Sequence, residues 1–390
     1  MNSVHSLERF AALLRARMLD CAPAIEPPDS SAAIFEDAEF NAFALELFNL
    51  QYQHNGAYRI FCESRHVTPE TLGEWGQIPA VPAAAFKEWD LSCLPEHERT
   101  TVFFSSGTTA HRPSRHFHNE SSLNVYETSL RKWFRAHFLL AEPHSFATAL
   151  SLTPTQLQAP NSSLVHMFET LRRDRIASSF AFTGQADIDG AWSLDVAATT
   201  GCLETSTAAK EPVLLLGTAF SYVYLLDFLT KRKLSFQLPP GSAILETGGY
   251  KGRTRVLPKK ELHELMTLWL GVPAPHIICE YGMSELSSQA YDRRLLKRTE
   301  QSRTRAGVGS AEFERLFQFP PWVRVQIVSP ETGHEVAEGE TGLIRVFDLA
   351  NVYSVMAIQT EDLAVKRAGG FELIGRAELS EPRGCSLKTV

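Results

Sequence analysis

Residues 213–229 have the sequence VLLLGTAFSYVYLLDFL, in which a short apolar run is followed by a longer apolar stretch. The run at 213–216 has the length and the unbroken hydrophobicity of a strand that is buried on both faces of a sheet. The stretch at 219–229 is long enough for a helix. The same alternation continues along the chain, where we expect strands at 243–246 and 276–279 and a helix at 259–270. Short buried strands that alternate with helices indicate an α/β fold, with parallel strands covered by helices.

The two ends of the chain have other patterns. The first part has apolar residues at helical spacing, as at Phe40, Phe43, Leu47 and Leu50. The last part favours strands at 322–328, 342–347 and 371–374, separated by turns that contain glycine. We therefore predict a helical N-terminal segment packed on the core at 1–95, an α/β core at 96–320, and a β-rich end with a C-terminal tail at 321–390.

Composition and charge exclude several classes of protein. The chain has 390 residues, of which 44% are hydrophobic and 21% charged, and its formal net charge is −7. This much apolar material excludes wholesale disorder, and the acidic balance argues against a general nucleic-acid binder. No apolar run approaches the ~20 residues that cross a bilayer, and the charged N-terminus is unlike a signal peptide. Six cysteines without a CxxC pair fit reduced thiols, so we expect a cytoplasmic protein with no membrane span and no nucleic-acid partner.

The first chemical signal is a loop rich in hydroxyl groups that follows an expected strand at 101–104. It consists of Ser105, Ser106, Gly107, Thr108 and Thr109. Backbone N–H and hydroxyl groups in such a loop can surround a polyphosphate. It is not a Walker A loop, because no Gly-Lys-Ser/Thr closes it. Taken alone, the loop also fits an ordinary Ser/Thr-rich surface turn.

The second signal lies directly after the strand expected at 276–279. It consists of Tyr281, Gly282, Met283, Ser284 and Glu285. Ligands of parallel sheets bind beyond the carboxyl ends of the strands. Here Tyr281 could lie against a purine ring, Ser284 could bind a phosphate, and Glu285 could hold a hydrated Mg²⁺. A strand-end turn with an exposed acid is the alternative.

The third signal is the run Thr360-Glu361-Asp362-Leu363-Ala364, which Gly375-Arg376 follows. Asp362, at the end of a strand, could accept hydrogen bonds from both ribose hydroxyls, and Arg376 could reach a phosphate. A solvated carboxylate on a hairpin is the alternative.

In this order, the three motifs resemble the motif series of the adenylate-forming superfamily, which includes acyl-CoA ligases and luciferase-like enzymes. Shorter matches resemble one branch, the LuxE-like acyl-protein synthetases, or long-chain-fatty-acid–luciferin-component ligases. These matches are SRH at 114–116, TGGYK at 247–251, FDLAN at 347–351, IGRAE at 374–378 and RGCSL at 383–387. The resemblance implies the superfamily's large N-terminal domain with a small β-rich end. Because the sequence stops soon after Arg376, we expect the mobile C-terminal lid domain to be absent.

The resemblance also implies roles for individual residues. It adds Gly248 and Gly249 to the ATP-binding residues, places Asp362 on the ribose and Mg²⁺ on Glu285, and gives Glu285 and Arg376 catalytic roles in adenylation. ATP and Mg²⁺ are the expected cofactors. Cys385 would take the acyl group from the adenylate as a thioester. An idle thiol on a frayed terminus is the alternative for Cys385.

These features predict a ligase that activates a carboxylic acid, expected to be a fatty acid, and releases pyrophosphate. The acyl group would pass to Cys385 and then to a partner protein such as a reductase or a carrier protein. One alternative is a ligase that acylates the external phosphopantetheine thiol of coenzyme A or of a carrier protein. A second is a non-catalytic acyl-binding subunit. His166 lies in an apolar run that is more typical of a core histidine, although it could line the acyl pocket.

Overall fold

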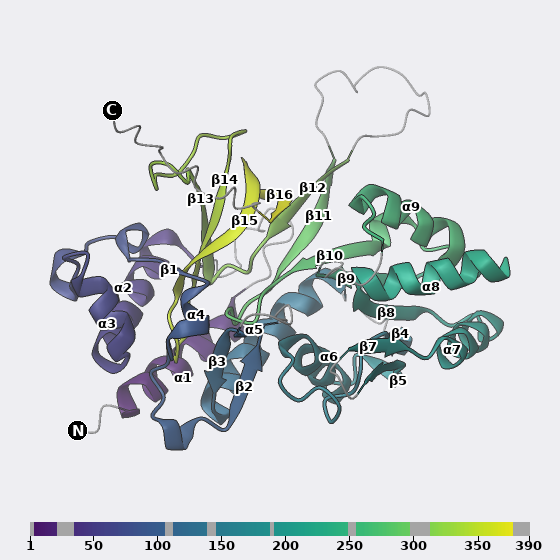
Figure 1. The fold of residues 1–390 in the computed structure, drawn as a ribbon, viewed down its shortest axis with the longest axis horizontal. Coiled ribbons are helices and arrows are strands. Elements are labelled where there is room, and N and C mark those ends of the chain that lie inside the picture. Colours follow the sequence, from purple (N-terminus) through teal and green to yellow (C-terminus); the bar gives the residue numbers. More distant parts are fainter. Residues whose placement is uncertain are drawn as a thin grey trace, which may run out of the picture.

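The computed structural model describes residues 4–21, 35–105, 112–138, 146–187, 191–248, 255–296 and 313–376 (Figure 1). A twelve-stranded sheet forms its centre, in the order β13-β14-β15-β16-β12-β11-β10-β9-β8-β4-β5, and β1 pairs with β15 beside this path. One half of the sheet is parallel and the other half is largely antiparallel. The halves join where β10 pairs with β11 in antiparallel fashion. The expected α/β fold is therefore confirmed, with parallel and antiparallel strands in a single sheet.

The parallel half is buried on both faces. It consists of β4 (Phe146–Ser151), β5 (Ala177–Phe182), β8 (Val213–Thr218), β9 (Ala243–Thr247) and β10 (Ile277–Tyr281). All six residues of β8 are buried, and its alternate side chains point to opposite faces. Leu215 packs in the apolar cluster of α7 (Val196–Ala209), α8 (Ala219–Arg232) and α9 (Lys259–Leu270). Leu214 packs in the cluster of α5 (Glu120–Phe138) and α6 (Ser163–Arg173), so helices cover both faces, as the apolar run at 213–216 predicted.

Local signals set the ends of the helices in this half. At the start of α8, the side-chain oxygen of Thr218 accepts a hydrogen bond from the backbone N–H of Ser221 at 3.3 Å. Helix α9 ends at Gly271, which has a φ of +71° and lies so close to Gln237 that a Cβ would be 2.7 Å from its side-chain oxygen. Only glycine suits both constraints. The bounds of α9 are those that the sequence predicted.

The other half of the sheet contains the β-rich end. Its strands are β11 (Ala290–Leu296), β12 (Phe313–Gln318), β13 (Val323–Val328), β14 (Thr341–Asp348), β15 (Ala357–Arg367) and β16 (Gly370–Arg376), with β1 (Val81–Pro82) parallel to β15. Two hairpins lie outside the sheet: β2 (Thr101–Phe104) with β3 (Arg115–His118), and β6 (Gly184–Ala186) with β7 (Trp192–Leu194). The strand expected at 101–104 therefore exists, but it belongs to a separate hairpin.

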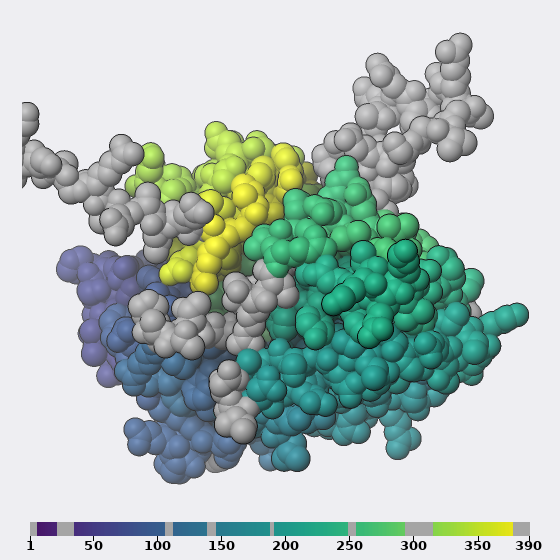
Figure 2. Space-filling view, turned by 45° about the vertical axis from the view of Figure 1, so that its right-hand side comes forward, coloured from purple at the N-terminus to yellow at the C-terminus, as the bar shows by residue number. Residues whose placement is uncertain are grey.

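The N-terminal segment packs on the antiparallel half (Figure 1). Its helices are α1 (Val4–Asp20), α2 (Asp37–His54), α3 (Gly56–Glu63) and α4 (Ala85–Glu88), and short 3-10 turns lie at Pro69–Thr71, Trp75–Gln77, Glu96–Glu98 and, in the core, Ala274–His276. Phe40 and Leu47 of α2 are fully buried, and the Trp75 ring lies 4.8 Å from that of Phe347. In Figure 2 the yellow strands lie between the purple and blue N-terminal segment and the green and teal parallel half.

Within the described ranges, no helix combines the length and the apolar character that a membrane span requires.

Candidate functional site

The carboxyl ends of β9 and β10 lie side by side, and the predicted motifs begin there. The two strands are parallel, with Glu280 opposite Thr247. Gly248 follows β9 with a φ of +68°, which favours glycine. Gly282 follows β10, and a Cβ there would collide with the Glu280 carboxylate. Both glycines therefore let the backbone turn away from the end of the sheet.

Tyr281, at the carboxyl end of β10, contacts the antiparallel half of the sheet. Its hydroxyl donates a hydrogen bond to Oδ2 of Asp362 at 2.9 Å. The tyrosine ring is 7% exposed and is held by the ring edges of Phe317, Phe319 and Phe371, with centroids 5.7–6.2 Å away. Burial raises the pKa of Tyr281, as does the adjacent carboxylate. The ring is thus fixed before any ligand arrives.

Asp362 lies inside β15, although the sequence predicted it at the end of a strand. The pairing of β15 with β16 shifts register between Leu363 and Ala364, and this irregularity lies next to Asp362. Burial raises the pKa of the Asp362 carboxyl, whereas the Tyr281 hydroxyl and Arg376 lower it. Arg376 is paired with Asp362 across the strands, and its guanidinium lies 3.3 Å from the Glu361 carboxylate. The structure thus brings Tyr281, Asp362 and Arg376 together.

Glu285 lies in the turn that follows β10, four residues after Tyr281. Its carboxyl is buried, and burial raises its pKa, although hydrogen bonds from the Ser114 and Ser284 side chains lower it. The Ser284 hydroxyl lies 3.1 Å from Oε2 of Glu285. Nδ1 of His116, on β3, lies 2.9 Å from the backbone oxygen of Ser284 and fixes the turn. Met283, which precedes Ser284 in the sequence, is partly buried.

The base of the hydroxyl-rich loop meets Glu285 through Ser114. Ser105 and Ser114 exchange two hydrogen bonds: Ser105 N–H donates to the Ser114 carbonyl at 3.2 Å, and Ser114 N–H donates to the Ser105 hydroxyl at 2.9 Å. Ser114 therefore contacts both Ser105 and the Glu285 carboxyl. Ser114 was not predicted as a site residue. Five predicted residues, Ser106, Gly107, Thr108, Thr109 and Gly249, lie outside the described residues, as does Cys385.

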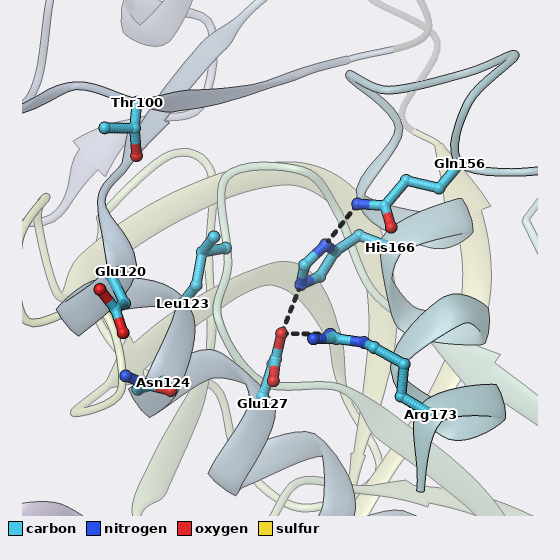
Figure 3. Close-up of a pocket in the computed structure, with 8 residues that line it drawn as sticks. All are labelled: Thr100, Glu120, Leu123, Asn124, Glu127, Gln156, His166 and Arg173. Atoms are coloured by element: carbon cyan, nitrogen blue, oxygen red, sulfur yellow. Dashed lines mark hydrogen bonds and ion pairs between the residues drawn. The ribbon is translucent and has the colours of Figure 1, made fainter. Parts of the chain in front are cut away.

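His166 lies on α6, away from these motifs. Its Nε2 is 3.0 Å from Oε1 of Glu127, and Arg173 donates a hydrogen bond to the same oxygen. Figure 3 shows both side chains pointing at Glu127 from α6. They line a cavity of about 370 Å³, together with Thr100, Glu120, Leu123, Asn124, Glu127 and Gln156.

A row of buried rings, each tilted against the next, lies between His166 and the Ser284 turn. The ring centroids are 5.2 Å apart from His166 to Phe103, 4.6 Å from Phe103 to His118, and 4.1 Å from His118 to His116. Burial lowers the pKa of both His116, to about 4, and His118. These two imidazoles are therefore neutral at pH 7.

A second group of polar side chains is buried between β9, β10 and α9. Glu246, His263 and Cys279 place a carboxylate oxygen, a ring nitrogen and a sulfur within 4.8 Å of one another. Lys259 lies in the same group; burial opposes its charge, but Cys279 and Glu246 raise its pKa overall. The Lys259 ammonium therefore lies close enough to this group to offset the charge of the Glu246 carboxylate.

The fold is shared with solved ligase structures. The chain is similar to a crystal structure of 2-hydroxyisobutyryl-CoA ligase in an open conformation with 2-HIB-AMP and CoA, with a TM-score of 0.60 and 15% identity over 90% of this chain and 74% of that one. The same ligase in its thioesterification state gives a TM-score of 0.60 and 16% identity over 90% and 72%. The fold is that of the adenylate-forming ligases.

Sequence comparisons identify one family among the proteins that share this fold. The sequence model of the family described as "Acyl-protein synthetase, LuxE" matches residues 29–389, so the chain belongs to this family and is a ligase. The chain is 22% identical over 360 residues to the long-chain-fatty-acid–luciferin-component ligase of Aliivibrio fischeri, covering 88% of this chain and 85% of that one. The ligase of the same name from Vibrio harveyi is 22% identical over 355 residues, covering 87% and 84%. The resemblance stated from the motifs is confirmed.

Proposed function

We propose that this ligase activates a fatty acid with ATP and passes the acyl group to a thiol. The acid's carboxylate oxygen attacks the α-phosphorus, the bond from that phosphorus to the bridging oxygen breaks, and pyrophosphate leaves with the electron pair. A thiolate then attacks the acyl carbon, and AMP leaves. The observation that carries this proposal is the convergence of Tyr281, Asp362, Glu285 and Ser105, from three distant parts of the sequence, beside the carboxyl end of β10.

The residues beside the carboxyl end of β10 suit the parts of a nucleotide. The Asp362 carboxylate, oriented by Tyr281, is the group we assign to the ribose hydroxyls. The Ser105 hydroxyl and the hydroxyl and N–H groups of the residues that follow it are assigned to the phosphates, and Arg376 is assigned to the charge that develops on them. Gly248 leaves room for a ring at the end of β9, because no atom of the described residues lies within 4 Å of where its Cβ would be. Stacking of adenine on Tyr281 stays a prediction.

Glu285 fits a magnesium ligand on the chemistry of its surroundings. Its carboxyl is 5% exposed, and burial makes its ionised form costly. A divalent cation would offset this cost, and oxygen ligands suit Mg²⁺. Bound Mg²⁺ would screen the polyphosphate from the attacking carboxylate. Glu285, held by Ser114 and Ser284, would orient that ion.

We assign the thiol to Cys385 and the final acceptor to a partner protein. The support is the family, whose described activity is acyl-protein synthesis, and the names of the two relatives, which specify a long-chain fatty acid and a luciferin component. A thiolate is a strong nucleophile toward an acyl-adenylate. Acylation of coenzyme A is the second candidate, because the ligase of similar fold was solved with CoA.

His166 lines a cavity with a charged border. It was predicted to line the acyl pocket, but its cavity is bordered by Glu120, Glu127 and Arg173, and an alkyl chain there would cover charged groups. We therefore assign this cavity a polar occupant and not the acyl chain.

Direct detection of the intermediate tests the proposal. The protein is incubated with ATP, Mg²⁺ and single fatty or aromatic acids, quenched, and searched for acyl-AMP by mass spectrometry. Parallel samples contain coenzyme A. We expect acyl-AMP with a fatty acid, and an acylated protein. Acyl-CoA without acylated protein would favour the second candidate, and no acyl-AMP with any acid would favour a non-catalytic acyl-binding subunit.

A further inference from the structure

The segment that follows Glu285 is held by a loop from a distant part of the sequence. The side-chain amide of Asn351 donates to the backbone oxygen of Glu285 at 2.9 Å and to that of Val355 at 3.1 Å. Asp348, three residues earlier, accepts from Ser287 N–H at 3.0 Å and from the Ser288 hydroxyl at 2.8 Å. The loop at 348–356 therefore fixes the backbone on which the Glu285 carboxylate is mounted.

The same loop is held in turn by helix α2. The Gln51 side chain donates to the backbone oxygens of Asn351, at 2.7 Å, and Val352, at 3.2 Å, and accepts from Met356 N–H at 3.0 Å. Gln51 is fully buried, and Asn351 is 1% exposed. One carboxamide thus satisfies three backbone groups of a loop that lies 300 residues away in the sequence. Because buried polar groups are costly to leave unpaired, this arrangement has little freedom to shift.

The orientation of the Asn351 amide follows from its partners. Both carbonyl partners require donors, which places the nitrogen toward Glu285 and Val355. Its Oδ1 is buried and has no partner among the described residues. The amide is therefore kept in place by its donor side, and a side chain without two N–H donors cannot replace it.

We propose that Asn351 and Gln51 are positioning residues for Glu285: they form a brace from helix α2 to the carboxylate assigned to Mg²⁺. This inference rests on the proposed function, since it assumes that Glu285 acts on magnesium-bound ATP. Neither residue touches the substrate. Loss of the brace lets the Glu285 carboxylate shift away from the Ser114 and Ser284 hydroxyls, so the first effect falls on magnesium and not on nucleotide affinity in general.

The experiment measures the Mg²⁺ dependence of ATP binding and of pyrophosphate exchange in Asn351→Ala, Gln51→Leu and the wild type. We expect the half-saturating free Mg²⁺ concentration to rise about 10-fold in Asn351→Ala and about 3-fold in Gln51→Leu. ATP affinity in excess EDTA should stay within about 2-fold of the wild type. If Asn351→Ala does not fold, the Mg²⁺ titration of Gln51→Leu tests the brace by itself.

The matched control is Asn55→Ala. Asn55 is also a buried amide on the N-terminal segment, caps α3 through Tyr58 N–H at 3.1 Å, and reaches Ser354 of the same loop at 3.4 Å, but among the described residues its side chain makes no hydrogen bond to Asn351 or Glu285. It should lower thermal stability without a change in Mg²⁺ dependence. A Mg²⁺ titration of Asn351→Ala and Gln51→Leu within 2-fold of the wild type, at similarly lowered stability, would overturn the brace. Absence of exchange in the wild type would instead refute the proposed function, and ATP binding would still test the brace.

Discussion

The hydroxyl of Tyr281 donates to the carboxylate of Asp362 at 2.9 Å, which ties the end of β10 to the middle of β15. The two residues lie 81 positions apart in the sequence. A buried hydrogen bond to a carboxylate is stronger than one between neutral groups, so it orients both partners. Among the described residues the other Asp362 oxygen has no hydrogen-bond donor, so it can accept a hydrogen bond from a ligand.

Asp362→Ala should weaken ATP binding by about 10- to 100-fold, because two charge-assisted hydrogen bonds to the ribose are lost. Tyr281→Phe keeps the ring and removes only the hydroxyl, so it should weaken binding by no more than about 5-fold. Calorimetric titration with ATP and Mg²⁺ measures both. Unchanged affinity in Asp362→Ala would show that the ribose role is wrong.

Glu285→Gln should lower the rate of adenylation by about 100-fold or more at saturating ATP, because the ligand for Mg²⁺ is lost. The same change should leave the protein at least as stable at pH 7, since burial raises the pKa of this carboxyl and its ionised form opposes folding. Pyrophosphate release and thermal unfolding report the two effects. A destabilised but fully active variant would mean that Glu285 has a structural role.

Glu280 should make stability depend on pH. Burial raises the pKa of its carboxyl to about 7, while the Thr247 hydroxyl lowers it. The folded state therefore holds this proton more tightly than the unfolded state, and the associated stability is present at low pH and lost as the pH rises from about 4.5 to about 7. Glu280→Gln removes this loss, on the order of 3 kcal/mol.

Urea unfolding of the wild type and Glu280→Gln across this pH range checks the sign. Glu204→Gln, at an exposed position on α7, is the control and should follow the wild type. Equal pH slopes for wild type and Glu280→Gln would contradict the prediction.

Cys385→Ser should still form acyl-AMP but should carry no thioester. The serine hydroxyl is a much weaker nucleophile than a thiolate at neutral pH, so the adenylate should accumulate. Incubation with ATP, Mg²⁺ and labelled fatty acid, followed by hydroxylamine, measures the labile label. Cys202→Ser serves as the control, because this thiol is the partly exposed one on α7. Equal thioester labelling in Cys385→Ser would point to another acceptor.

Local signals in the sequence predicted much of the parallel half. Helix α9 is bounded by Pro258 and Gly271, and the run at 213–216 is hydrophobic because both of its faces are covered. The pairing of β10 with β11, which joins the two halves into one sheet, depends on contacts distant in sequence and has no local signal. Asp362 was expected at a strand end for the same reason, since register shifts are not encoded locally.

The site was predictable only where residues fall in motifs. Tyr281, Glu285 and Asp362 belong to short runs with recognisable chemistry, whereas Gln51 and Asn351 act through carboxamides whose partners are backbone groups. An isolated glutamine on an amphipathic helix has no pattern that distinguishes it from a surface residue. Asn351 was within the FDLAN match at 347–351, but its contact with Glu285 required the fold.

We propose above all that this chain forms an acyl-adenylate beside the carboxyl end of β10, near Tyr281, Asp362 and Glu285. Carboxylate-dependent exchange of labelled pyrophosphate into ATP tests it most directly, because exchange requires reversible adenylation and no thiol acceptor. We predict exchange with a fatty acid and Mg²⁺ in the wild type and in Cys385→Ser, and its loss in Asp362→Ala and Glu285→Gln. No exchange by the wild type with any fatty or aromatic acid, or full exchange in Glu285→Gln, would contradict the account.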